Sequence, residues 1–271
     1  MTVRSRPPRF RPQMPPSSSP FASSWLGYLD VAVVLTWGIL LLKYQITGEI
    51  YFLLHPDYMW LATSAGVGLL GLGGFLIWQI LPLPRRSARR SKLANVQHIS
   101  LFPRSFSSTL LIAVGVLGLV ITPRPFASDI ALQRGVTDTL TMTRSQPQAF
   151  HATNRPEERS LIEWVRTLNV YPEPDAYTGQ RANVQGFVIH PSELPDDYLM
   201  ISRFIITCCA ADAYPVGLPV KLSQDRSAYP ADRWFEIQGE MMTETLNDQR
   251  QLVIKATSLE EIPEPRNPYD Y

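Results

Sequence analysis

Three long apolar stretches occupy the first half of the chain, and strand-like alternation occupies the second half. The apolar stretches are Trp25–Tyr44, Tyr58–Leu81 and Ser107–Ile121. A helix that crosses a bilayer needs about 20 apolar residues. The third stretch is shorter, so it can span only with flanking residues or with local thinning of the bilayer. The pattern predicts three transmembrane helices, and the alternative is a buried helix in a soluble domain.

The basic residues predict the orientation of these helices. The N-terminal tail has four Arg and the loop 82–106 has six Lys or Arg, whereas the loop 45–57 has none. Because basic loops stay in the cytoplasm, we expect a cytoplasmic N-terminus and, after three spans, an extracytoplasmic C-terminal half. The expected location is the bacterial inner (plasma) membrane. A Pro-rich leader precedes the first stretch and no small-x-small site follows it, so we expect an uncleaved anchor.

After the third stretch the period of the apolar residues changes twice. Leu161, Trp164, Val165 and Leu168 follow helical spacing behind a helix start at Pro156, which predicts a short amphipathic helix. Five β-rich runs come next, and together they are compatible with an OB-like five-stranded small barrel. These runs are Val184–His190, Leu199–Cys208, Val216–Leu222, Trp234–Met241 and Leu252–Leu259.

Composition divides the chain into four predicted regions. Residues 1–24 form a basic, Pro-rich leader, which we expect to be disordered and cytoplasmic. Residues 25–122 form the three-span transmembrane domain, and residues 123–155 form a Thr- and Ser-rich linker. Residues 156–271 form the extracytoplasmic all-β domain with its preceding helix.

The two halves carry opposite charge. Residues 1–144 hold fourteen Lys and Arg against five acidic residues, whereas residues 145–271 hold eleven against nineteen. Nucleic acid is the usual partner of an OB-like barrel, but binding a phosphate backbone depends on Lys and Arg. The acidic second half therefore predicts no nucleic-acid partner.

The only two cysteines, Cys208 and Cys209, are adjacent. Neighbouring Cα atoms lie about 3.8 Å apart, which is closer than the roughly 4.4–6.8 Å of ordinary disulfides. In a continuous strand the two side chains would point to opposite faces. Only a bulge or turn at Cys209 would bring both sulfurs to one side.

Three interpretations of this cysteine pair remain open: a metal site, a thiol redox centre, and buried structural cysteines. Asp212 and His190 are the nearby residues that, with the two cysteines, would hold a transition-metal ion such as zinc, although the spacing is not a common zinc pattern. Arg203 would either lower a thiol pKa or pair with an acid. Thr207 and Asp212 would cap a turn around the pair.

Other polar residues predict no further chemistry. His55 and Asp57 are expected in a polar loop at the membrane boundary. The sequence has no Ser-His-Asp order, phosphate-binding loop or dinucleotide fingerprint. We therefore assign no catalytic residue and no cofactor-binding residue, and the sequence leaves the cofactor unknown, with a transition-metal ion such as zinc as the candidate.

Several short motifs resemble an uncharacterised family of bacterial membrane proteins, the YcgQ-like family, regarded as a permease subunit. The cysteine segment Arg203–Ala213 is the most specific of them. The others are Leu54-His55-Pro56, Pro123–Ser128, Arg134-Gly135, Gly179-Gln180, Gly186–Val188, Pro215–Leu218, Trp234, Gly239 and Asn267–Tyr271. The resemblance implies a membrane-anchored partner of a multi-pass, YcgR-like permease that serves metal or metalloid homeostasis.

These observations lead to one expected function and two alternatives. We expect an accessory subunit of a permease complex whose outer domain binds a metal ion or thiophilic solute, with the glycine-bearing second span packed against the partner in lipid. The alternatives are a membrane-bound thiol oxidoreductase and a purely structural interaction module.

Overall fold

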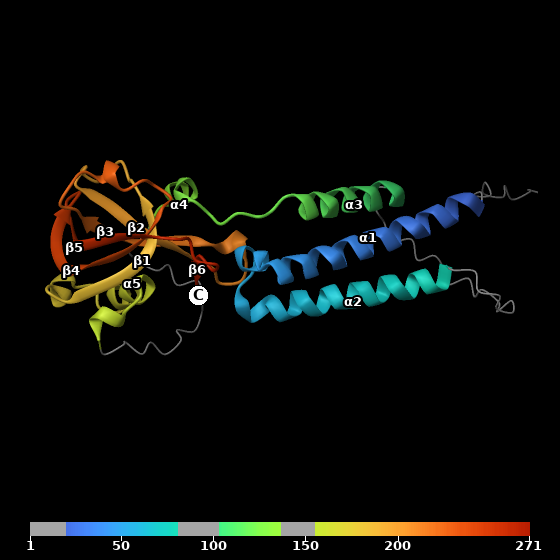
Figure 1. The fold of residues 1–271 in the computed structure, drawn as a ribbon, viewed down its shortest axis with the longest axis horizontal. Helices are drawn as coiled ribbons and strands as arrows, with labels where there is room; N and C mark the ends of the chain where they lie inside the picture. Colours follow the sequence, from blue (N-terminus) through green and yellow to red (C-terminus); the bar gives the residue numbers. More distant parts are fainter. Residues whose placement is uncertain (1–19, 81–102, 137–154) are drawn as a thin grey trace, which may run out of the picture. The chain divides into compact units, whose positions relative to one another are not determined.

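The protein is described by a computed structural model over residues 20–80, 103–136 and 155–271 (Figure 1). Contacts divide it into two compact units. The helical unit consists of the chain up to Leu42 together with residues 64–121. The β unit consists of residues 43–63 and 122–271. The predicted leader, apart from its last five residues, and most of the basic loop 82–106 lie outside the described residues.

Two helices near the N-terminus are long and apolar enough to cross a membrane. They are the 23 residues Trp25–Thr47 of α1 (Pro20–Thr47) and the 25 residues of α2 (Pro56–Ile80). The third predicted span forms α3 (Arg104–Val120), whose 17 residues fall short of the usual spanning length. The structure therefore supports two candidate spans, and the third apolar stretch is confirmed only as a helix.

Two glycines of α2 form its close contact with α1. A Cβ atom on Gly73 would lie 2.4 Å from Cδ2 of Leu35, and one on Gly66 would lie 3.1 Å from Cγ of Leu42. Gly71 and Gly74 have no atom within 4 Å of the same position. Only some glycines of α2 therefore pack against α1, as small residues do between helices in lipid.

Side-chain hydrogen bonds join α3 to α1. The hydroxyl of Ser108 donates to Oδ1 of Asp30 at 3.0 Å, and the indole of Trp37 donates to the carbonyl of Leu111 at 3.1 Å.

The helix α4 (Ser128–Arg134) lies inside the segment predicted as a linker. Its Ala131 is fully buried in an apolar cluster with Phe187 and other residues of the β unit. Residues 137–154 of that predicted linker lie outside the described residues.

All five predicted strands are present, with shifted ends. They form a mixed sheet with a sixth, two-residue strand that the sequence pattern did not show. The strands are β1 (Arg181–Ile189), β2 (Tyr198–Ile205), β3 (Tyr214–Lys221), β4 (Trp234–Leu246), β5 (Gln249–Ile262) and β6 (Tyr269–Asp270).

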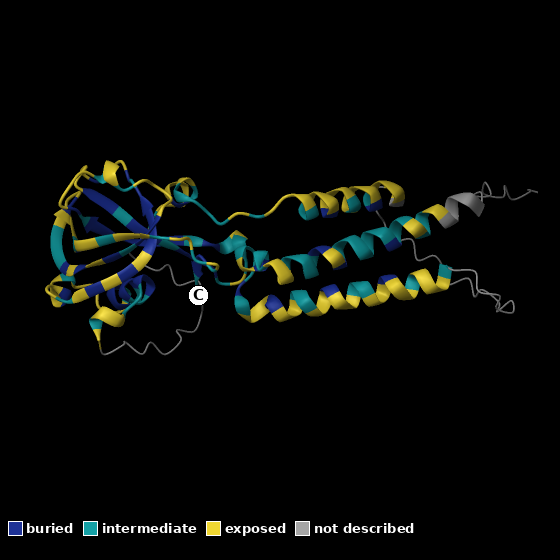
Figure 2. Cartoon of the chain, in the orientation of Figure 1, coloured by how far each residue is buried: buried dark blue, intermediate teal, exposed yellow. Residues whose placement is uncertain are grey.

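Strand pairing runs in a closed ring. β1 pairs with β2 and β4, β5 pairs with β4 and β3, and β3 pairs with β2. The added strand β6 lies outside this ring and runs parallel to the end of β2. The buried residues lie along these strands, as the dark-blue bands in Figure 2 show.

The predicted amphipathic helix is confirmed as α5 (Leu161–Val170), but its predicted start at Pro156 is wrong, because Pro156 begins a separate 3₁₀ turn and Ser160 caps the helix. A capping box begins it: Ser160 accepts from the backbone of Glu163, whose carboxylate accepts from the backbone of Ser160. Trp164 is completely buried in the core formed with the strands. Short 3₁₀ turns complete the fold: η1 (Glu49–Phe52), η2 (Pro156–Glu158), η3 (Pro174–Tyr177), η4 (Ala210–Asp212) and η5 (Arg226–Ala228).

Candidate functional site

The paired cysteines lie in a turn just beyond the end of β2. The predicted strand continued to Cys208, but β2 ends at Ile205. The next residue still donates its backbone N–H, to the carbonyl of Asp270 at 3.1 Å, and the chain then turns into η4. Alternation along a strand therefore does not apply to Cys208 and Cys209.

One carboxylate organises this turn. Asp212 accepts the backbone N–H groups of Thr207, Cys208 and Cys209 at 3.2, 2.8 and 3.3 Å. It also accepts the hydroxyl of Thr207. A carboxylate has about four acceptor positions on its two oxygens, and these four donors use them. The turn that sequence analysis associated with Thr207 and Asp212 is present, and in it Asp212 positions the backbone around the cysteines.

The turn brings the two sulfurs to the same side. Their Sγ atoms are 3.6 Å apart, and both thiols are free. Cys208 is exposed and Cys209 is half-buried. This is the convergence that a turn at Cys209 was expected to produce. The two sulfurs therefore lie together on one side of the turn, and Cys208 is open to solvent.

The same contacts determine the protonation states of the Cys208 thiol and the Asp212 carboxylate. The Asp212 carboxylate, followed by the Cys209 thiol, raises the pKa of the Cys208 thiol to about 12. Burial pushes the pKa of Asp212 upward, but hydrogen bonds from Thr207 and Cys208 outweigh it and hold that pKa below its ordinary value. At neutral pH the turn therefore holds an ionised carboxylate beside a protonated Cys208 thiol.

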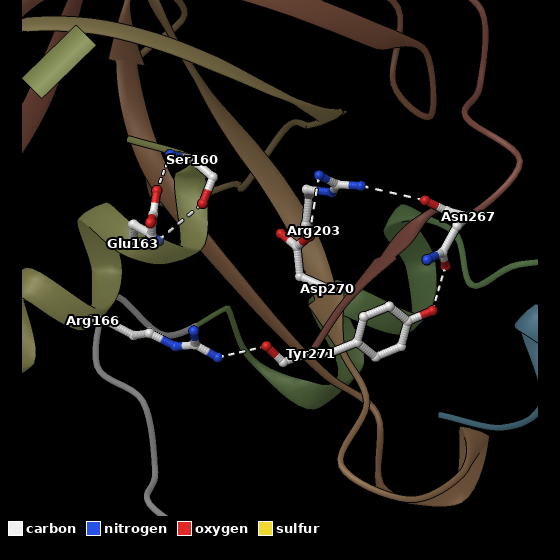
Figure 3. Close-up of polar contacts among 7 residues, drawn as sticks. All are labelled: Ser160, Glu163, Arg166, Arg203, Asn267, Asp270 and Tyr271. Atoms are coloured by element: carbon white, nitrogen blue, oxygen red, sulfur yellow. Dashed lines mark hydrogen bonds and ion pairs between the residues drawn. The ribbon is translucent and has the colours of Figure 1, made fainter. Parts of the chain in front are cut away.

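The remaining predicted site residues have other partners. The imidazole Nε2 of His190 lies 2.8 Å from the carbonyl of Tyr229. Arg203 forms an ion pair with Asp270 at 3.3 Å, and Figure 3 shows its guanidinium directed to this carboxylate and to the carbonyl of Asn267. Across the described ranges, no group of three or more His, Cys, Asp or Glu side chains is arranged to hold a metal ion.

A second segment, which no sequence pattern predicted, contacts the turn. The backbone N–H of His55 donates to the carbonyl of Cys208 at 3.1 Å, and that of Ala210 donates to the carbonyl of Leu53 at 2.9 Å. Between these two bonds, Leu54 pairs with Cys209 as an isolated antiparallel bridge. The available signal was the motif Leu54-His55-Pro56, but nothing in its composition indicated a strand-like contact.

His55 itself differs from the polar boundary loop predicted for it. Only 8% of its surface is exposed. Its Nδ1 accepts the backbone N–H of Asp57 at 3.1 Å, and its ring meets the ring of Tyr271 edge-on at 4.7 Å. The imidazole is therefore a packed structural group at the beginning of α2.

Comparison with known proteins finds similarity over the part of the chain that contains the turn. Residues 157–271 match the DUF1980 C-terminal domain. The chain is also 27% identical over 133 residues to the UPF0703 protein YcgQ of Bacillus subtilis (strain 168). That alignment covers 47% of this chain and 46% of YcgQ, so the chain spans about half the length of this curated relative.

Both similarities support the resemblance to a YcgQ-like uncharacterised family. The range that matches the DUF1980 C-terminal domain contains α5 and the sheet, and it also includes the cysteine turn. It does not include Leu53–His55, which reaches the turn from outside the matched range.

Proposed function

We propose that this chain is a membrane-anchored accessory subunit of a permease complex, and that its DUF1980 domain binds a thiophilic metal ion through Cys208 and Cys209. The observation that carries the proposal is the 3.6 Å separation of the two sulfurs on an exposed turn. A pair of thiolates on one side of a turn chelates one soft ion without further rearrangement of the backbone.

The sulfur separation favours a tetrahedral ion. Zinc–sulfur bonds are about 2.3 Å long, so two sulfurs on a tetrahedral zinc lie roughly 3.8 Å apart. A linear two-coordinate ion with similar bonds would require about 4.6 Å between them. The observed 3.6 Å is close to the tetrahedral value. A tetrahedral ion such as zinc is therefore the ion that the pair fits best, with two coordination positions left for other ligands.

In this proposal only the two cysteines remain of the four metal ligands expected from the sequence. Asp212 already accepts four hydrogen bonds, so it acts by positioning the cysteines and not as a ligand. His190 has the carbonyl of Tyr229 as its neighbour. We propose that the remaining ligands come from water or from the partner.

The anchor part of the proposal rests on the helical unit. Two candidate spans and the attachment of α3 to α1 through Asp30–Ser108 support a three-helix membrane domain in which α3 is a short third span. With a cytoplasmic N-terminus, that topology would place the DUF1980 domain outside the cytoplasm. Three helices are few for a transport path, which supports the role of partner to a multi-pass, YcgR-like permease.

The closed ring of strand pairing supports the OB-like interpretation of the sheet. The acidic charge of residues 145–271 argues against a nucleic-acid partner for it. The alternative of a thiol oxidoreductase is less well supported, because an attacking thiol must ionise readily, whereas the Asp212 carboxylate raises the pKa of Cys208.

Cadmium titration of the full chain in detergent tests the metal proposal. We expect one Cd²⁺ per chain, with a thiolate-to-cadmium absorption band that Cys208→Ser and Cys209→Ser each weaken and that the double variant abolishes. Cys-independent binding, or an absent band in the native chain, would refute the dithiol site.

Purification from native membranes in mild detergent tests the partnership. We expect a multi-pass membrane protein to accompany the chain in stoichiometric amount. Recovery of the chain without such a protein would remove the support for an accessory subunit, while the metal proposal would still stand on the titration.

A further inference from the structure

The most specific motif of the sequence and the Leu54-His55-Pro56 motif meet in the β unit. They are more than 150 residues apart in the chain, yet Leu54 and Cys209 face each other across an antiparallel bridge. The hydrogen bonds His55 N–H to Cys208 O and Ala210 N–H to Leu53 O flank this pair. Residues in such a non-hydrogen-bonded pair come close together, with their side chains on the same face.

The contact fixes the peptide group that joins the two cysteines. Its carbonyl, on Cys208, accepts the N–H of His55 at 3.1 Å. Its N–H, on Cys209, donates to Oδ1 of Asp212 at 3.3 Å. The orientation of this peptide determines the directions of both Cα–Cβ bonds, so it also determines whether the sulfurs converge. Asp212 therefore holds one side of the peptide, and His55 holds the other.

The contact also lies next to the beginning of α2 in the chain. Pro56 is the first residue of that helix, and the N–H of Asp57 in its first turn donates to the imidazole of His55. The same imidazole packs edge-on against the ring of Tyr271, the residue that follows β6. A displacement of the Cys208–Cys209 peptide would therefore act on a residue that is bonded to the first turn of a candidate membrane span.

We propose that Leu53–His55 is the positioning half of the dithiol site, and that binding of an ion by Cys208 and Cys209 is communicated through it to the first turn of α2. This inference rests on the proposed metal-binding function and adds a regulatory element to it. The site is composite: the DUF1980 domain supplies the sulfurs, and the segment between the two candidate spans holds them in the binding geometry.

The substitution Ala210→Pro removes one of the two bonds with little other change. Ala210 is the first residue of η4, a position at which Pro is tolerated. Cys209 before it has φ −155° and ψ 170°, the extended conformation that a residue preceding Pro prefers. The control Ala210→Ser keeps the N–H group.

We expect Ala210→Pro to lower the Cd²⁺ affinity of the full chain about three- to tenfold, as the loss of one backbone hydrogen bond implies. The control Ala210→Ser should bind like the native chain and show the same thiolate-to-cadmium band. Equal affinities of the proline and serine variants would overturn the inference while leaving the dithiol site itself intact.

Hydrogen exchange on the native chain gives an independent test. Cd²⁺ should slow amide exchange in the peptide that covers residues 53–58, because the His55 N–H bond to Cys208 becomes more persistent. Cd²⁺ should leave this peptide unchanged in the Cys208→Ser/Cys209→Ser variant. Unchanged exchange in a native chain that binds Cd²⁺ would contradict the inference, whereas a native chain that binds no Cd²⁺ would instead refute the proposed function.

Discussion

At the scale of single residues, Asp212 determines the chemistry of the cysteine turn. It aligns three consecutive N–H groups and raises the pKa of Cys208 to about 12. A thiol with a raised pKa is protonated at neutral pH, so an incoming metal ion must displace its proton. The affinity for the ion should therefore rise with pH below this pKa.

Asp212→Asn tests the electrostatic part of this role. In a Cys209→Ser background, removal of the carboxylate should lower the pKa of Cys208 toward the ordinary thiol value of about 8.5. More thiolate would then be present near pH 8, and the midpoint of the pH dependence of alkylation, followed by mass spectrometry, should fall. Asp225→Asn is a matched control, because Asp225 caps the distant turn η5 through Ser227. A midpoint unaffected by Asp212→Asn would exclude this electrostatic role.

Trp164 is the residue whose loss should cost the β unit most. It is completely buried, and its indole nitrogen has no hydrogen-bond partner among the residues that the structure describes. Trp164→Ala should therefore lower the free energy of unfolding by about 3–5 kcal/mol. Trp164→Phe, which sacrifices no hydrogen bond, should lower it by only about 1–2 kcal/mol.

Thermal unfolding of the full chain, followed by near-ultraviolet circular dichroism, checks both values. Val170→Ala, at the exposed end of the same helix, should change stability by no more than about 0.5 kcal/mol. Similar losses for the Ala and Phe variants would mean that the shape of the whole indole ring, and not the amount of buried apolar surface, makes the main contribution.

At the scale of elements, periodicity in the sequence was sufficient for the five longer strands and α5, but not for α4 or β6. β1 and β4 show alternating apolar residues because one of their faces is more buried over part of the strand, whereas β2 and β3 show nearly continuous apolar runs because both of their faces are buried. The strand β6 has two residues and therefore no period, and pairing with β2 alone defines it. The end of β2 could not be predicted for a related reason. Cys208 continues an apolar run of the sequence, and the strand ends where Asp212 caps the turn that follows it.

The composite nature of the site was beyond what the sequence could show. The bonds from His55 and to Leu53 use backbone groups, which every residue has, so no side-chain pattern indicates them. The candidate cysteines, Thr207 and Asp212 were identifiable because their side chains are chemically distinctive. His190 was included for the same reason, although its nearest polar neighbour is the carbonyl of Tyr229.

The packing of α1 on α2 gives a prediction that separates two adjacent glycines. A side chain at Gly73 would collide with Leu35, whereas the same position at Gly74 is open. Gly73→Ile should destabilise the helical unit by about 1–3 kcal/mol, the usual cost of overpacking, and Gly74→Ile should be tolerated. The midpoint for thermal loss of helix in detergent measures the difference. Equal effects of the two substitutions would contradict this helix contact.

At the scale of the whole molecule, the number of spans decides which compartment the cysteines face. A cytoplasmic N-terminus, as the basic N-terminal tail predicts, combined with two spans would return the domain with the cysteine turn to the cytoplasm. The same N-terminus with α3 as a third span would place that domain outside. Since the chain contains only these two thiols, they report the location of the domain without any added label.

We expect a membrane-impermeant maleimide to label Cys208 in intact cells whose outer barrier is permeable to the reagent. The raised pKa of this exposed thiol makes the reaction slow at neutral pH, so the labelling should be done at the highest pH that the cells tolerate. The Cys208→Ser/Cys209→Ser variant gives the background, and lysed cells give the maximum. Labelling that occurs only after lysis would place the domain in the cytoplasm and exclude α3 as a third span, whereas equal labelling before and after lysis would establish the three-span topology on which the permease proposal depends.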